Sequence, residues 1–300
     1  MRKKRGGAHL FGLAVLGLVL GAVITVLIVR YAPLRRGGEE GPKPSARLIQ
    51  PPVPPPLIKP KPSPGLDLTG RPELPAGETL RVAIVIDDMG QDMKKLMEIL
   101  KVDAPITVAV LPHLLHSRDV ARAAHSNGLE VLLHLPMEPK NSGAEEHDPG
   151  QGALLTAMDK ADIRAMVEED LKDVPFAVGI NNHMGSQFTE NMELMRVVLE
   201  VVKRRDLYFL DSRTTPASVG NRLAEEMGVR FAMRNVFFDN TRDEAYIKGQ
   251  IMELASIARK RGKAVAIGHP YPETIKALKD NVSMLERHGI QVVRLSELLN

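Results

Sequence analysis

The chain has 300 residues, a net charge of +3 and no cysteine. That length allows one large domain with additional segments, and the lack of cysteine excludes both a disulfide framework and a thiolate metal site. The charge is uneven, because residues 1–78 contain 12 Lys and Arg against 5 Asp and Glu, whereas residues 79–300 contain 28 against 32. The second part is therefore mildly acidic, which argues against a nucleic-acid-binding domain, since such a domain carries a basic face.

Residues 1–30 predict a cytoplasmic tail and one transmembrane helix. Positions 2–5 are all basic, and they precede an uncharged, mostly apolar run at 10–29 that Arg30 closes. Twenty helical residues span about 30 Å, the thickness of a bilayer core. A cleaved signal peptide has a shorter apolar region of roughly 7–15 residues and a small-residue cleavage site, so we interpret this run as an uncleaved signal anchor.

The charge around this apolar run predicts its orientation. Basic residues are denser before the run than after it, which places the N-terminus in the cytoplasm and the rest of the chain on the other side. We therefore expect a single-pass protein of the inner, or cytoplasmic, membrane. Its C-terminal domain would face the periplasm or the cell exterior.

Residues 31–80 predict a disordered, proline-rich linker. Five of the six residues at 51–56 are proline. Such a segment favours the extended polyproline II conformation and has too little apolar content to fold alone. We expect a semi-rigid spacer that holds a domain away from the membrane.

Residues 81–300 predict one α/β domain. Apolar runs that predict strands lie at 82–86, 106–111, 130–134, 177–180, 207–210, 229–232, 264–267 and 291–295. Helical patterns lie between them, for example at 93–100, 117–127, 160–171, 191–204 and 243–261. This alternation predicts a parallel sheet, open or closed into a barrel. Seven or eight strands in this length suit a barrel, whose eight-stranded form takes about 250 residues.

Two adjacent carboxylates, Asp87 and Asp88, end the first predicted strand. The strand is apolar along its whole length, which is typical of a strand buried on both faces. An ionised carboxylate in a core costs several kcal/mol unless it is paired or bound to a metal, so packing does not explain the pair. The two alternatives are a cap on the helix that follows and a functional site at the carboxyl end of a parallel strand.

Polar residues also follow the later strands. His134 ends the third strand, and Asp211 ends the fifth. His183 follows the fourth strand and His269 the seventh. The carboxyl ends of parallel strands meet at one rim, so these side chains are expected to gather there. The stretch 138–156 is the longest polar loop and predicts a lid or a wall beside this rim.

The residue types at this rim predict metal-assisted hydrolysis. Imidazole nitrogens and carboxylate oxygens suit zinc or another divalent first-row metal. An Asp beside a ligating Asp can act as a general base on an activated water, and a further His can act as a general acid on the leaving group.

These strand-end motifs resemble those of the divergent polysaccharide deacetylases, a branch of the carbohydrate esterase deacetylases. The resemblance covers about residues 81–298. The motifs that carry it are Ile86-Asp87-Asp88-Met89-Gly90, His134-Leu135-Pro136-Met137-Glu138, Asn181-Asn182-His183-Met184-Gly185-Ser186, Asp211-Ser212 and Gly268-His269-Pro270.

The resemblance implies a deformed (β/α)7-8 barrel with a divalent metal, usually zinc, at its carboxyl rim. In the main family the first acid of an Asp-Asp pair is the base and the second binds the metal, which maps onto Asp87 and Asp88. His134 matches the first of two metal-binding histidines spaced four residues apart, whereas the second position holds Glu138. Either Glu138 or His183 would supply the missing ligand, and we prefer His183 because an imidazole restores the usual ligand type.

The remaining motif residues are expected to contact or support a substrate. His269 matches the family's late histidine and would be the general acid. Asp211 could orient His269 or close the substrate pocket, and Tyr271 is the best candidate for stacking on a sugar ring. Other residues expected near the substrate are Asn181, Asn182, Ser186 and Ser212.

The resemblance implies a metal-dependent hydrolase that removes acetyl groups from an N-acetylated polysaccharide or a peptidoglycan-type glycan. Two departures, Glu138 and the lack of the main family's arginine motif, support an alternative. In that alternative the chain is a catalytically degenerate glycan-binding or envelope-scaffold protein with the same fold. A phosphoesterase is disfavoured, because the domain is acidic and has no glycine-rich phosphate cradle.

Overall fold

The computed structural model describes residues 79–141 and 148–299, all of which lie in the compact unit Pro60–Asn300. The predicted anchor at 1–30 and all but the last two residues of the predicted linker at 31–80 lie outside the described residues. Among the residues that the structure describes, no helix is both long and apolar enough to cross a membrane.

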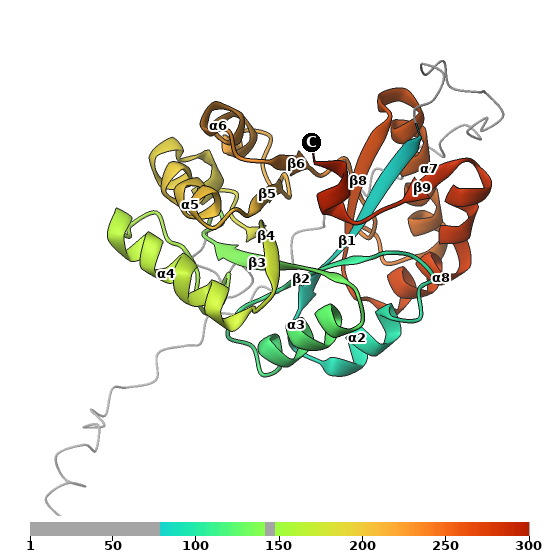
Figure 1. Cartoon of the computed structure of the whole chain (residues 1–300), viewed down its shortest axis with the longest axis horizontal. Helices are drawn as coiled ribbons and strands as arrows, with labels where there is room; N and C mark the ends of the chain where they lie inside the picture. Colours follow the sequence, from blue (N-terminus) through green and yellow to red (C-terminus); the bar gives the residue numbers. More distant parts are fainter. Residues whose placement is uncertain (1–78, 142–147, 300) are drawn as a thin grey trace, which may run out of the picture. The chain divides into compact units, whose positions relative to one another are not determined.

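Strands and helices alternate along the described chain (Figure 1). The strands are β1 (Leu80–Met89), β2 (Thr107–Val110), β3 (Glu130–Met137), β4 (Ala177–Met184), β5 (Tyr208–Asp211), β6 (Phe231–Met233), β7 (Val236–Phe237), β8 (Lys263–Gly268) and β9 (Ile290–Val292). The α-helices are α2 (Met93–Ile99), α3 (Ser117–Ser126), α4 (Lys160–Asp173), α5 (Met192–Arg204), α6 (Gly220–Met227), α7 (Glu244–Arg261) and α8 (Pro272–Arg287). Two short 3-10 helices are η2 (Phe188–Glu190) and η3 (Leu295–Leu298).

The strands form one parallel sheet in the order β6-β5-β4-β3-β2-β1-β8-β7, with β9 paired to β1. The predicted parallel α/β architecture is confirmed, but the described strands form a half-barrel rather than a ring closed by hydrogen bonds. Its two edges, β6 and β7, are joined by only Arg234 and Asn235. Arg234 N donates to Asp211 O of β5, and Asn235 N donates to Val265 O of β8, so these two residues bridge the opening.

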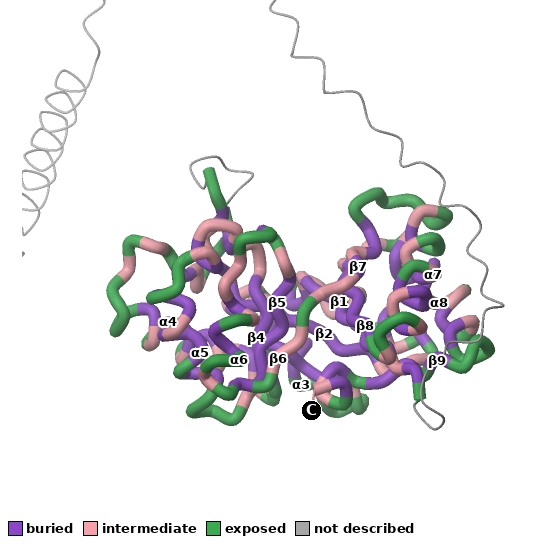
Figure 2. The backbone as a smooth tube through the Cα atoms, turned by 90° about the horizontal axis from the view of Figure 1, so that it is seen from above, coloured by how far each residue is buried: buried purple, intermediate pink, exposed green. Residues whose placement is uncertain are grey.

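The central strands β1, β2 and β3 are buried on both faces because two apolar clusters cover them. A large cluster packs the sheet against the helices and includes Val82, Ile84 and Ile86 of β1. A smaller cluster lies on the inner side of the curved sheet and includes Ala83 and Val85. Figure 2 shows the buried residues concentrated along the strands and the exposed residues on the outer helices and loops. Alternate residues of one strand therefore enter two different cores, which explains the continuous apolar runs.

The acid that caps α2 is Asp92, not Asp87 or Asp88. The Asp92 side chain accepts a hydrogen bond from Lys94 N (2.8 Å), as an N-cap residue does. Asp87 and Asp88 belong to β1 itself. The capping alternative for this pair is therefore wrong, and the carboxylates need another explanation.

We predict that Gly179→Ala destabilises the domain. A Cβ at Gly179 of β4 would lie 2.6–2.8 Å from three ring atoms of Tyr208. Tyr208 is buried, and its hydroxyl donates to Glu130 Oε1 (2.8 Å), so the ring has no room to move. We expect a loss of about 1–3 kcal/mol in the free energy of unfolding, measured with a chemical denaturant.

Gly249→Ala is the matched control for this prediction. Gly249 is an exposed residue within α7, and nothing lies within 4 Å of the Cβ that alanine would add. This substitution should stabilise the domain by up to about 1 kcal/mol, because alanine favours the helix over glycine. A Gly179→Ala variant as stable as the wild type would show that the Tyr208 ring is not held in place.

We also predict that one buried carboxyl group makes stability depend on pH. Burial raises the pKa of Asp170 in α4 from 3.8 to about 7, although His113 Nε2 lies 2.7 Å from its Oδ1. The folded protein thus holds a proton that the unfolded chain releases. The free energy of unfolding should fall as the pH rises from about 4 through about 7, by on the order of 2–4 kcal/mol.

The pH dependence of unfolding in Asp170→Asn tests this prediction. The amide keeps the shape of the side chain but does not ionise, so the fall in stability between these pH values should shrink. Asp119→Asn on the exposed face of α3 is the control and should keep the wild-type slope. Parallel curves for the wild type and Asp170→Asn would contradict the assignment.

Candidate metal and catalytic site

A cavity of about 510 Å³ opens at the carboxyl ends of the strands. Its lining comes from β1, β3, β4 and β7 and from the segments that follow β5, β6, β7 and β8. The lining residues are Asp87, Asp88, His134, Asn182, His183, Met184, Ser212, Arg213, Thr214, Arg234, Phe237, Asn240 and His269. The described parts of the predicted lid at 138–156 contribute none of them.

Strand alternation directs three of these side chains inward. Asp87, His134 and His269 each lie two residues after a member of the inner apolar cluster. Those members are Val85, Leu132 and Ile267. Because successive side chains of a strand point to opposite faces, the three polar groups continue the inner face beyond the point where the apolar core ends.

Backbone conformation is unusual at three positions around the cavity. Asp88 (φ 55°), Met184 (φ 47°) and Arg213 (φ 55°) are all in the left-handed region, each at or just after the end of a strand. The pairing of β1 with β2 also shifts register between Ile86 and Met89. Such conformations cost about 1–3 kcal/mol each in non-glycine residues and cluster at functional sites. At Asp88 this irregularity brings the second acid of the pair into the same cavity as the first.

Asp88, His134 and His183 form a cluster whose geometry suits a metal ion. Asp88 Oδ1 lies 3.3 Å from His134 Nε2 and 3.1 Å from His183 Nδ1, and these two nitrogens are 3.1 Å apart. Ligands of a tetrahedral zinc ion with bonds of about 2.0–2.1 Å lie about 3.3 Å from one another. Asp88 Oδ1 is also buried and accepts no hydrogen bond, so its lone pairs are available to a cation.

Asn181 holds two of the site residues in place. Its Nδ2 donates to Asp87 Oδ1 (2.9 Å), so its Oδ1 accepts from His134 Nδ1 (2.9 Å). A proton on His134 Nδ1 leaves Nε2 with a free lone pair that faces Asp88. Outer hydrogen bonds of this kind select the tautomer that binds a metal.

The two acids differ in their electrostatic environment. Burial raises the pKa of the Asp87 carboxyl group above its ordinary value, although His134, His269 and Asn181 oppose this effect. Burial acts in the same direction on Asp88, but the close approach of His134 and His183 outweighs it and holds the pKa of Asp88 well below the ordinary value. Asp88 is thus the permanent anion of the pair, and Asp87 is the carboxyl group that takes a proton more readily.

His269 lies across the cavity and is oriented by Asp239, a residue that the strand-end pattern of the sequence does not predict. His269 Nδ1 lies 2.9 Å from Asp239 Oδ1, while Asp239 Oδ2 accepts from His269 N (2.6 Å) and from Thr274 Oγ1 (2.7 Å). The other ring nitrogen, Nε2, lies 3.6 Å from Asp88 Oδ2. Burial lowers the pKa of His269, but the hydrogen bond to Asp239 and the nearby carboxylates outweigh this and raise it.

The prediction that Asp211 could orient His269 is wrong. Asp211 follows Leu210, a member of the inner cluster, so alternation turns it toward the helices. Its Oδ2 accepts from Ser218 Oγ (2.7 Å) and Asn221 Nδ2 (3.2 Å), and its Oδ1 accepts from Arg213 N (2.8 Å). Asp211 shapes the loop between β5 and α6 instead.

Glu138, the alternative third ligand, is held away from the cluster. Its Oε2 accepts from Thr156 N (2.6 Å) and Thr156 Oγ1 (2.5 Å). Glu138 does not line the cavity, and the ligand cluster found among the described residues contains His183 instead. The geometry therefore agrees with our preference for His183.

The other predicted residues divide between the cavity and its surroundings. Asn182 lines the cavity, and its Oδ1 accepts from Ser212 N (2.9 Å), which ties the ends of β4 and β5 together. Ser212 Oγ is 3.2 Å from Asn181 Nδ2. Ser186 is outside the cavity lining and accepts from Lys140 N (2.9 Å). Tyr271 lies beside His269, with ring centroids 5.4 Å apart.

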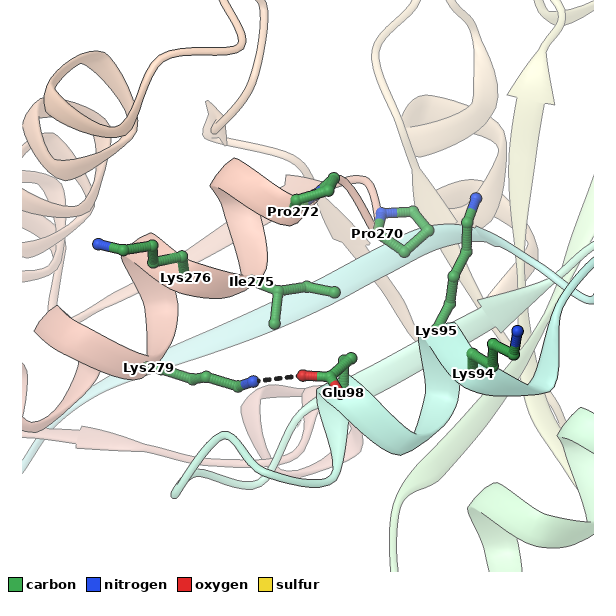
Figure 3. A pocket seen from close by; sticks show the side chains of 8 residues that line it. All are labelled: Lys94, Lys95, Glu98, Pro270, Pro272, Ile275, Lys276 and Lys279. Atoms are coloured by element: carbon green, nitrogen blue, oxygen red, sulfur yellow. Dashed lines mark hydrogen bonds and ion pairs between the residues drawn. The ribbon is translucent and has the colours of Figure 1, made fainter.

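A second cavity of about 510 Å³ lies between α2 and α8 (Figure 3). Its residues are Lys94, Lys95, Glu98, Pro270, Pro272, Ile275, Lys276 and Lys279. Lys279 Nζ pairs with Glu98 Oε2 at 2.7 Å across it, as Figure 3 shows. No histidine and only one carboxylate line this cavity, so it lacks the group of possible metal ligands found in the cavity at the strand ends.

The fold and the site define an α/β half-barrel protein with a metal-type Asp-His-His cluster at the carboxyl rim of its sheet. A sequence model described as divergent polysaccharide deacetylase matches residues 84–299. The chain therefore belongs to the divergent polysaccharide deacetylase family.

Two relatives and one solved structure match about the same part of the chain. The chain is 40% identical to an uncharacterized protein of Escherichia coli K12, YibQ, over 73% of this chain and 67% of that protein. It is 36% identical to an uncharacterized protein of Haemophilus influenzae Rd, over 73% of this chain and 76% of that one. The crystal structure of an uncharacterized protein, ATU2773, from Agrobacterium tumefaciens C58 has a similar fold. Its TM-score is 0.70 at 24% identity, over 76% of this chain and 92% of that one.

Proposed function

We propose that the chain is a metal-dependent hydrolase that removes acetyl groups from the amino groups of a glycan in the cell envelope. The observation that carries this proposal is the convergence of Asp88, His134 and His183 between Asp87 and His269. Family membership supports the class of substrate. The predicted N-terminal anchor supports an action outside the cytoplasm.

Asp88, His134 and His183 would hold the metal ion, for which we propose zinc. A bound zinc ion supplies a Lewis acid that polarises the acetyl carbonyl group and makes water a stronger nucleophile. The protein contributes the preformed arrangement of the three ligands, fixed through Asn181 and the strand ends.

Asp87 and His269 would move the protons of the reaction. Asp87 takes a proton from the attacking water, because it is the buried carboxylate beside the cluster and Asn181 holds it in place. His269 donates a proton to the amide nitrogen as the carbon–nitrogen bond breaks, which releases acetate and leaves a free amine on the sugar. Asp239 keeps the His269 ring turned so that Nε2 faces the cavity.

The test is metal content and acetate release of the purified full-length chain, with N-acetylated chitooligosaccharide and peptidoglycan fragments. We expect about one zinc ion per chain and acetate release that a chelator abolishes and zinc restores. His183→Ala should weaken zinc binding by at least about 10–100-fold. Removing only a residue that hydrogen-bonds to a metal ligand already causes a loss of this size, and His183 is a ligand itself. Glu138→Gln is the matched control and should keep the metal.

The second candidate is a glycan-binding or envelope-scaffold protein without catalysis. It is favoured by the departure at Glu138, which is engaged with Thr156 rather than with the cluster. Glycan binding without acetate release at any metal concentration would support this candidate and overturn the hydrolase. Chelator-sensitive acetate release would exclude it.

A further inference from the structure

Arg213 lines the cavity from the loop between β5 and α6, and hydrogen bonds fix the backbone of this loop around it. Its backbone N donates to Asp211 Oδ1 (2.8 Å), and its carbonyl oxygen accepts from Arg234 Nη2 (3.0 Å). Arg234 Nε also donates to the carbonyl oxygen of Ser212 (2.6 Å). These bonds hold Arg213 in the left-handed conformation, at φ 55°. The buried carboxylate of Asp211 and the guanidinium of Arg234 therefore both fix the backbone around Arg213.

The Arg213 side chain has no acidic partner in the described part of the chain. Its only polar contact there is a weak one from Nη1 to the sulfur of Met233 (3.9 Å). Other arginines of the described chain behave differently, since Arg118, Arg164 and Arg204 each pair with a carboxylate on a neighbouring element. Arg213 is a half-buried cation that lines the cavity without a counter-ion.

The two aromatic rings beside the cavity, Tyr271 and Phe237, already contact cationic or imidazole side chains. The guanidinium carbon of Arg242 lies 3.6 Å from the centre of the Tyr271 ring, so the ring predicted to stack on a sugar carries a cation on one face. The Phe237 ring has Arg234 5.1 Å from its centre and His269 at its edge. A sugar bound in this cavity would therefore contact charged groups rather than free aromatic faces.

We propose that Arg213, supported by Arg234, binds a carboxylate group carried by the glycan, so that the substrate is an acidic N-acetylated sugar. A guanidinium group offers two parallel N–H donors that match the two oxygens of a carboxylate. This proposal rests on the proposed function, because it names the substrate class of the same cavity. The acetylated nitrogen would lie at the Asp-His-His cluster and the carboxylate at the β5–α6 side.

The test compares one substrate in two forms. The first is a peptidoglycan disaccharide fragment with its lactyl carboxylate free, and the second is the same fragment as the methyl ester. We expect kcat/KM of the full-length protein to be about 10–100-fold higher for the acid than for the ester. This ratio corresponds to the contribution of one hydrogen bond between charged groups. Arg213→Ala should abolish the preference for the acid over the ester, and Arg213→Lys should keep part of it. Arg164→Ala, on the outer face of α4, is the control and should keep the whole preference.

Binding measurements separate this proposal from the proposed function. Equal kcat/KM for the acid and the ester would overturn the role of Arg213 and leave the hydrolase intact. If neither form releases acetate, the hydrolase fails, and calorimetric affinities for the two forms decide the role of Arg213. Tighter binding of the acid by the wild type but not by Arg213→Ala would support the carboxylate site, and equal or undetectable binding of both forms would overturn it.

Discussion

Asp87→Asn is expected to lower kcat for acetate release by about 10²–10⁴-fold, the contribution of a positioned general base. Asp87 is buried and close to the cluster, with its Oδ2 3.6 Å from His134 Nε2. The amide of asparagine keeps the oxygen that accepts from Asn181 Nδ2, so the surrounding hydrogen bonds survive. What the variant loses is the ability to take a proton.

Zinc content separates a base from a ligand in this experiment. Asp87→Asn should retain zinc, because the three ligand residues are unchanged. Asp92→Asn makes the same chemical change at the half-buried N-cap of α2 and should leave activity as it is in the wild type. Loss of zinc from Asp87→Asn would make Asp87 a ligand, and full activity would remove it from the mechanism.

Asp239→Asn is expected to lower kcat for amide hydrolysis by about 10²–10⁴-fold, because His269 then loses its role as general acid. Asp239 accepts three hydrogen bonds, from the ring and backbone nitrogens of His269 and from Thr274. An asparagine replaces one of the two accepting oxygens with an NH₂ group. That group cannot accept a hydrogen bond from His269 or Thr274. The His269 ring then turns or changes tautomer, and Nε2 no longer carries its proton into the cavity.

An aryl acetate substrate shows whether this loss concerns the leaving group. A phenolate leaves without being protonated, so Asp239→Asn and His269→Ala should both hydrolyse the aryl acetate far better than the amide, relative to the wild type. Asp87→Asn should lose both activities. The double variant should be no worse than His269→Ala alone, because the two residues act as one unit. Asp243→Asn at the N-cap of α7 is the control and should keep the wild-type activity on both substrates. Losses of kcat that add up in the Asp239→Asn and His269→Ala double variant would contradict the coupling of these two residues.

Much of the site could be predicted from the order of polar residues along the chain. Asp87, Asp88, His134, His183 and His269 all follow apolar runs, and the fold brings their side chains around one cavity. The prediction succeeds because parallel strands place their carboxyl ends at the same rim, whatever the loops between them do.

Asp239 and Arg213 could not be found in this way. Asp239 follows β7, which has only two residues and therefore no periodic pattern that marks it as a strand. The signal that was available is the alternation of side chains along β5. It turns Asp211 toward the helices and so excludes it as the partner of His269. Arg213 carries no sequence signal, because its position depends on a left-handed backbone held by two other residues.

The amino-acid sequence alone determined the parallel α/β class and the set of chemical groups at the rim. Both follow from local patterns: apolar runs long enough for buried strands, each ended by a polar residue. Tertiary structure decided which groups form pairs. The choice of His183 over Glu138, of Asp239 over Asp211 and of a half-barrel over a closed ring depends on contacts between residues far apart in the chain. Those contacts are set by how the sheet curves, and no local pattern encodes that curvature.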